Sequence, residues 1–163
     1  MAIAAIPSMF ASNDCEKLNL DVFTRLHRCM PLSRDASSLW NALVRTHHIT
    51  SRTKVDKIRH ATNSLECYAL LRYGGAPGIM YVEGNEESVS RWIEHVKSLR
   101  YKDYHLAVRP ALVRREGMDS ITDLRMVGQD ESPTVSDFGV RMRQRGVYDW
   151  WRRGMGFARV DGL

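Results

Sequence analysis

The stretch that decides the fold is CYALLRYGGAPGIMYVEGNEESVSRWIEHVKSLRYKDYHLAVRP, residues 67–110. It opens with two short runs rich in aliphatic and aromatic residues, 67–73 and 79–84. Between them lies GGAPG (74–78), in which glycine permits positive φ and proline presets a turn. This arrangement predicts two neighbouring strands joined by a tight turn.

A helix and a further strand follow in the same stretch. Four apolar residues recur at helical intervals: Val89, Trp92, Ile93 and Val96. Asn85 stands just before them and is the predicted N-cap of this helix. Residues 104–110, YHLAVRP, predict a fourth strand that ends at Pro110.

One strand and one helix upstream complete the pattern. ALVRTHHI (42–49) is typical of a strand, and the segment 50–65 predicts a capped helix with a narrow apolar stripe. The order β-α-β-β-α-β predicts an α+β domain with a ferredoxin-like antiparallel sheet over 40–110. Right-handed crossovers place both helices on one face of that sheet. The other face is then either open or covered by another part of the chain.

The flanking segments are predicted to add helices. Residues 1–14 carry no charge before Asp14 and are interpreted as a disordered lead-in rather than a signal peptide. An N-terminal helix is predicted over 15–31, because apolar residues recur at helical spacing until Pro31.

Beyond the predicted sheet the chain becomes polar and then helical again. Residues 111–133 predict a loop, with one extra strand near 124–127. Residues 134–157 predict a C-terminal helical extension of the same domain, starting from a cap at Thr134 or Ser136.

Composition excludes several classes of protein. The 163 residues are 44% apolar and 26% charged, which is ordinary for a globular domain. No run of apolar residues is long enough for a membrane span, so no membrane association is expected. The three cysteines form no C-x-x-C pair, which predicts neither a disulfide framework nor a metal site. A reducing compartment, the nucleus or the cytoplasm, is the expected location, and no cofactor is expected.

Three segments carry a resemblance to a known family: HHITSRTK (47–54), PGIMYVEG (77–84) and SDFGVRMRQRGVYDWWRRGMGF (136–157). In order and spacing they resemble the domain of unknown function that follows the RWD domain in RWD-domain-containing proteins. The same family includes the C-terminal domain of the spliceosomal pre-mRNA processing factor three. The resemblance covers roughly residues 45–157 and implies a ferredoxin-like fold with a C-terminal helical extension. Because the spliceosomal relative holds small nuclear RNA, the resemblance also implies RNA binding. No complete RWD domain precedes these segments in the chain.

Charge provides the candidate RNA contacts. The net charge of +5 favours acidic partners. In the predicted helix 50–65 four cations oppose a single aspartate, Asp56: Arg52, Lys54, Lys57 and Arg59. Clustered lysine and arginine residues supply sequence-independent affinity for phosphates, although such a cluster is also typical of a plain solvated surface.

The C-terminal extension and the first strand add further candidates. The arginines predicted to contact RNA there are Arg141, Arg145, Arg152 and Arg153, and the first strand adds Arg45 and His47. Three aromatic residues are interleaved with these arginines: Trp150, Trp151 and Phe157. These rings either pack the extension onto the sheet or form a surface for a protein partner.

Catalysis is not predicted. His47, His48 and Cys67 invite a metal or nucleophile interpretation, but adjacent residues of a strand point to opposite faces. No nucleophile elbow, H-x-x-x-H pair or phosphate loop is present in the sequence. We therefore expect a non-catalytic RNA-binding or adaptor domain without a small-molecule substrate. The alternative is a protein–protein interaction module that binds no nucleic acid.

Overall fold

The computed structural model describes residues 38–117 and 125–157. The predicted lead-in (1–14) and the predicted N-terminal helix (15–31) lie outside the described residues. The part that is described is an α+β fold in which the elements follow the order βαββαββαα.

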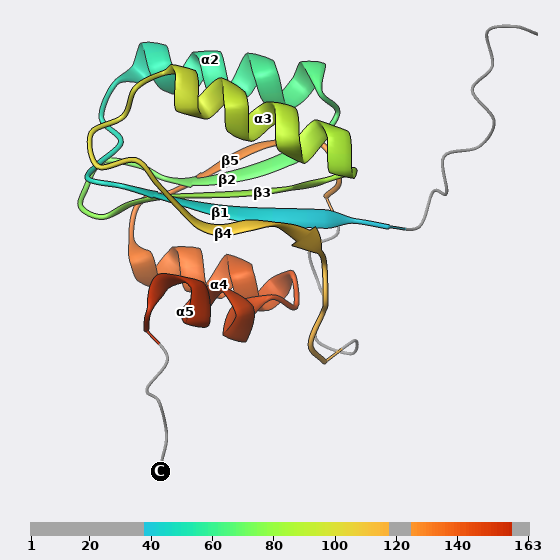
Figure 1. Ribbon diagram of the computed structural model, residues 1–163. Helices are drawn as coiled ribbons and strands as arrows, with labels where there is room; N and C mark the ends of the chain where they lie inside the picture. The colour runs from blue at the N-terminus through green and yellow to red at the C-terminus, as the bar shows by residue number, and fades with distance from the viewer. Residues whose placement is uncertain (1–37, 118–124, 158–163) are drawn as a thin grey trace, which may run out of the picture. The chain divides into compact units, whose positions relative to one another are not determined.

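A five-stranded sheet forms the middle layer (Figure 1). Its strands are β1 (Trp40–Thr46), β2 (Tyr68–Arg72), β3 (Gly78–Gly84), β4 (His105–Leu112) and β5 (Gly128–Ser132). They lie side by side in the order β4-β1-β3-β2-β5. The pairings among the first four strands are antiparallel, whereas β5 runs parallel to β2, so the sheet is mixed.

Two helices cover each face of the sheet (Figure 1). The first face carries α2 (Arg52–Ser64) and α3 (Glu86–Ser98), and the second carries α4 (Val135–Gln144) and α5 (Tyr148–Met155). Three of the four helices begin at residues whose side chains accept a backbone N–H bond: Ser51, Asn85 and Thr134. None of these four helices is long and apolar enough to cross a membrane.

The layer between the sheet and α2/α3 is built mainly from aliphatic side chains. The sheet contributes Val44, Leu71 and Val82, and Trp92 of α3 is the largest side chain that is fully buried there. The indole Nε1 of Trp92 donates a hydrogen bond to Thr62 Oγ1 at 2.8 Å, which satisfies the polar end of the ring.

The layer between the sheet and α4/α5 is richer in aromatic rings. Tyr81 from β3 and Phe138 from α4 are fully buried in it, and Trp151 from α5 is 3% exposed. The helix α5 approaches the sheet closely at Gly154, where an added Cβ would lie 2.5 Å from Val108 Cγ2. Glycine is therefore needed at this position for α5 to lie against the sheet.

Three sequence predictions need correction. A plain βαββαβ unit is wrong, because β5 adds a parallel fifth strand. The extra strand lies at Gly128–Ser132 rather than near 124–127. Its sequence, GQDES, has no apolar alternation and therefore gave no strand pattern. It forms a strand because its backbone pairs in parallel with that of β2. Pro110 does not end β4, which continues to Leu112 as an edge strand with shifts in register beside β1.

Candidate functional site

Two of the predicted RNA-contacting arginines of α2 are engaged within the protein. Arg52 Nη1 lies 2.8 Å from Glu131 Oε2, and Arg59 Nη2 lies 2.9 Å from Glu131 Oε1. The guanidinium of Arg52 also lies 3.9 Å from the centre of the Tyr73 ring. The hydrogen bond with Glu131 raises the pKa of Arg52, which remains charged but already has a counterion.

The two lysines of α2 are placed differently. Lys54 Nζ donates to the Arg100 carbonyl at 3.3 Å and lies 4.7 Å from the centre of the Tyr101 ring. Lys57 is exposed and lines a groove between α2 and α3. Lys57 therefore lines a concave surface, whereas Arg52, Lys54 and Arg59 do not line this groove.

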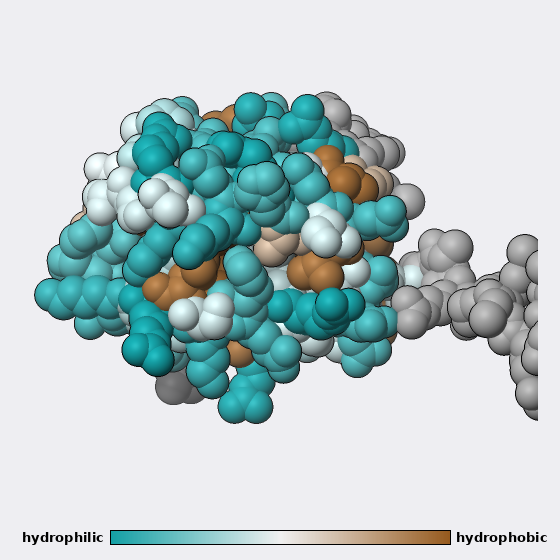
Figure 2. Space-filling model, turned by 90° about the horizontal axis from the view of Figure 1, so that it is seen from above, coloured by the Kyte–Doolittle hydropathy of each residue, from teal (hydrophilic) through white to brown (hydrophobic). Residues whose placement is uncertain are grey.

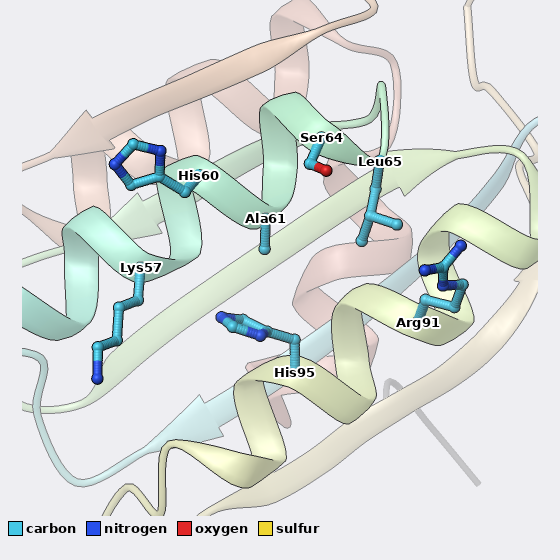
Figure 3. Close-up of a pocket in the computed structure, with 7 residues that line it drawn as sticks. All are labelled: Lys57, His60, Ala61, Ser64, Leu65, Arg91 and His95. Atoms are coloured by element: carbon cyan, nitrogen blue, oxygen red, sulfur yellow. The ribbon is translucent and has the colours of Figure 1, made fainter.

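The α2–α3 groove has a volume of about 490 Å³ (Figure 3). It is lined by Lys57, His60, Ala61, Ser64, Leu65, Arg91 and His95. No carboxylate is among these lining residues. Seen from the side of α2 and α3, hydrophilic side chains surround small apolar patches (Figure 2). The sequence led to Lys57 alone, because a groove between two helices is defined only by their packing.

A second cavity lies at the end of β1 and has a volume of about 280 Å³. Its lining includes Arg45 from β1 and His47 just after β1, together with Phe157 from the segment after α5. Met155, Ala76, Pro77, Thr46 and Asp103 complete it. His47 Nδ1 lies 3.6 Å from Asp103 Oδ2, between two exposed side chains. The fold thus places Phe157 beside Arg45 and His47, which the sequence singled out together on the first strand.

Arg145, another predicted RNA contact, is fully buried between the sheet and α4. Its Nη2 lies 2.7 Å from Glu83 Oε1, and its guanidinium lies 3.8 Å from the centre of the Tyr68 ring. Arg115 Nη2 lies 2.7 Å from the same oxygen of Glu83. A phosphate outside the fold has no access to Arg145, so this side chain is structural.

The electrostatics of this buried cluster follow from its charges. Burial acts to lower the pKa of Arg145, but the Glu83 carboxylate and the neighbouring Tyr81 and Tyr68 outweigh it, and the pKa is raised. Burial raises the pKa of Tyr81, and the nearby Glu83 carboxylate, which accepts its hydroxyl hydrogen bond, acts in the same direction. The phenol therefore stays neutral while the carboxylate and guanidinium stay paired.

The remaining C-terminal arginines lie at the surface. Arg152 Nη2 donates to the Phe157 carbonyl at 2.9 Å, which fixes the segment that carries the Phe157 ring. Arg153 lies 3.4 Å from Glu116, and Arg141 is exposed on α4. Arg152 does not line the second cavity, but its hydrogen bond holds the backbone of Phe157, which does.

The aromatic residues of the extension mostly pack inward. Trp151 contacts Phe138 and Tyr148, and Trp150 is half-buried with its ring edge-on to Tyr81 at 5.8 Å. Phe157 remains 40% exposed. These rings attach α4 and α5 to the sheet. The sequence left open whether the second face of the sheet is exposed, and in the structure these two helices cover it. An exposed tryptophan pair for protein docking is not present.

The side chains that invited a catalytic interpretation do not form a reactive site. Cys67 is fully buried, and burial raises the pKa of its thiol to about 12, so the thiol stays protonated. Within residues 38–117 and 125–157, no group of three or more His, Cys, Asp or Glu side chains is placed to hold a metal ion.

Sequence reasoning missed Glu83, Arg115, His60, Arg91 and His95. A glutamate inside the apolar run IMYVEG was a usable signal, because a buried carboxylate requires a cationic partner. The two histidines and Arg91 carried no such signal.

Comparison with models of protein families gives no match, and comparison with curated proteins gives none either.

Proposed function

We propose that this protein is a non-catalytic RNA-binding adaptor domain that holds an unpaired nucleotide at the end of β1. The observation that carries this proposal is the convergence of Arg45, His47 and Phe157 around one cavity of about 280 Å³. Phe157 is more than a hundred residues from Arg45 and His47 in the sequence, yet together they supply the groups that a nucleotide needs.

The chemistry of the cavity matches a nucleotide in two parts. Arginine and histidine side chains donate hydrogen bonds to phosphate oxygens. The half-exposed ring of Phe157 offers a face on which a base can stack, and such stacking tolerates any base. Affinity would therefore come with weak sequence preference.

The fold supports a strand-end site rather than an open-sheet site. Through β4 the elements follow a βαββαβ order with the strand order β4-β1-β3-β2, and we propose that the domain is a ferredoxin-like variant. RNA-recognition motifs of this architecture stack bases on the sheet surface. Here α4 and α5 cover that surface, so RNA would approach at the strand ends. The proposed resemblance to a family whose spliceosomal member holds small nuclear RNA is a further reason to propose RNA as the ligand class.

The test is fluorescence-anisotropy titration of the full chain with short single-stranded and double-stranded RNA at 50 and 200 mM salt. We expect binding to single-stranded RNA that weakens steeply with salt, because phosphate contacts release counterions. Arg45→Glu and Phe157→Ala should each weaken binding by about tenfold, consistent with the loss of one phosphate contact or one stacked base.

Arg109→Glu is the matched control. Arg109 is exposed on β4 and does not line the cavity, but the substitution changes the net charge as much as Arg45→Glu does. Equal losses of RNA affinity in Arg45→Glu and Arg109→Glu would show that only the overall charge matters, and not the cavity. Absence of RNA binding at the lower salt concentration would overturn the proposal and make a protein partner the leading function.

A further inference from the structure

The α2–α3 groove lies on the first face of the sheet, among helices that take no part in the β1-end cavity. All of its lining residues come from α2, α3 and the residue that ends α2. Lys57 lies on α2 and Arg91 on α3, so fixed positive charge approaches the groove from both helices (Figure 3).

Two imidazoles accompany these fixed charges. His60 is exposed on α2 with its ring directed away from α3, whereas the ring of His95 reaches from α3 toward α2 (Figure 3). The Nε2 atom of His95 is buried and has no hydrogen-bond partner among the described residues. A buried polar atom without a partner is costly, and a ligand oxygen would remove that cost.

The charged groups around the groove leave its positive character in place. On α3, Glu87 Oε1 lies 3.9 Å from Arg91 Nη1, a distant pair between exposed side chains. On α2, Asp56 is held by Arg59 at 2.7 Å. Glu94 is exposed on α3 and does not line the groove, and the sheet contributes no lining side chain.

We propose that this groove is a second phosphate-binding site for RNA, in which His60 and His95 take up protons as the phosphate binds beside Lys57 and Arg91. The inference rests on the proposed RNA-binding function and adds to it a separate site with its own pH dependence.

The physical reason for the proton uptake is the charge of the ligand. An RNA phosphodiester bound beside an imidazole favours the cationic, protonated form of the ring, so anion and proton bind together. Histidine exchanges its proton within the range of pH 5 to 8, so binding and protonation are linked there. Affinity for an RNA phosphodiester, which stays ionised throughout this range, therefore rises as the pH falls.

The experiment measures binding of the full chain to a short single-stranded RNA at pH 7.5 and pH 6.0, at constant ionic strength. For the unmodified chain we expect affinity about 3- to 10-fold higher at pH 6.0, the size expected for one or two linked protonations. In a His47→Gln background, which removes the imidazole of the β1-end cavity, the His60→Gln, His95→Gln double variant should lose most of this increase. His105→Gln, which removes an exposed histidine that lines neither cavity, should keep it.

Lys57→Gln separates fixed charge from proton linkage. It should lower affinity at both pH values while affinity still rises toward pH 6.0, because a lysine stays charged throughout this range and both histidines remain. A double histidine variant with an undiminished pH dependence would overturn the groove proposal, while the RNA-binding function would stand.

A direct readout covers the case in which RNA does not bind at all. Nuclear magnetic resonance of the histidine side chains, during titration with inorganic phosphate at pH 6.0, should show saturable shifts of His60 and His95. Shifts without RNA binding would retain an anion site and refute the RNA function. Shifts produced by a short acidic peptide but not by phosphate would overturn the phosphate proposal.

Discussion

The two faces of the sheet are held to their helices by different physical means. The buried polar residues between the sheet and α2/α3 carry no charge, as Thr62 illustrates, and apolar contact dominates. The layer between the sheet and α4/α5 contains the buried pair of Glu83 and Arg145. Apolar packing loses stability gradually with lost area, whereas a buried charge becomes very costly when its partner is removed. The second face should therefore be the more sensitive to single substitutions.

The largest effect is expected from breaking the charged cluster. Glu83→Ala leaves Arg145 buried without its carboxylate and Arg115 with one bond fewer, so we expect a loss of about 3–5 kcal/mol in unfolding free energy. Urea denaturation measures it. Asp56→Ala, which removes an exposed pair with Arg59, should cost less than about 1 kcal/mol. Similar costs for both variants would refute the special sensitivity of the buried cluster relative to an exposed ion pair.

A smaller effect is expected where α5 meets the sheet. Gly154→Ala places a methyl group 2.5 Å from Val108 Cγ2 and 3.0 Å from Leu43 Cδ2, and should cost about 1–3 kcal/mol through overpacking. Gly139→Ala on α4 meets Trp151 Cζ3 at 3.1 Å and should cost less. Denaturation curves of the two variants test this ranking, and a stabilised Gly154→Ala variant would contradict the close approach.

The hydrogen bond between Trp92 and Thr62 on the first face joins two neutral groups and should contribute less to the unfolding free energy than the features above. Trp92→Phe removes the donor to Thr62 Oγ1 along with part of the buried ring, and we expect a loss of about 1–2 kcal/mol. Repeating the substitution in a Thr62→Val background isolates the hydrogen bond in a double-mutant cycle. Exact additivity of the two substitutions would show that the bond contributes nothing.

Removing a helix N-cap should have the smallest effect on stability. Ser51 caps α2 on the first face, and Thr134 caps α4 on the second. Thr134→Ala removes the 3.0 Å bond from Asp137 N and should cost about 1 kcal/mol. Ser51→Ala removes a longer bond, 3.4 Å from Lys54 N, and should cost less. Thermal unfolding of both variants measures the difference, and a larger loss for Ser51→Ala would reverse the expected order.

Local patterns predicted local elements well. The helix through Val89, Trp92 and Val96 lies where the sequence placed it, beginning after Asn85, because helical spacing and capping are properties of neighbouring residues. The strands around the turn at 74–78 also lie close to their predicted positions. β5 was missed in part because its pairing partner, β2, lies some sixty residues away.

Long-range contacts explain what the sequence did not predict about the sites. The stripe of Phe138 and Met142 indicated a buried helix face, but not the surface that buries it. Arg145 looked like the other arginines, since its partner Glu83 is 62 residues distant. Arg45 and His47 were singled out by type, and only the fold shows that they share a cavity with Phe157.

The two outer strands of the sheet have a consequence for self-association. Exposed strand edges can template the addition of a strand from another molecule, which is a route to aggregation. β4 blocks that route with Pro110, which lacks an amide hydrogen, and with the register shifts beside β1. β5 is only five residues long, so it offers few backbone groups to an incoming strand. Both edges are therefore poor templates for the addition of a further copy of the described sheet.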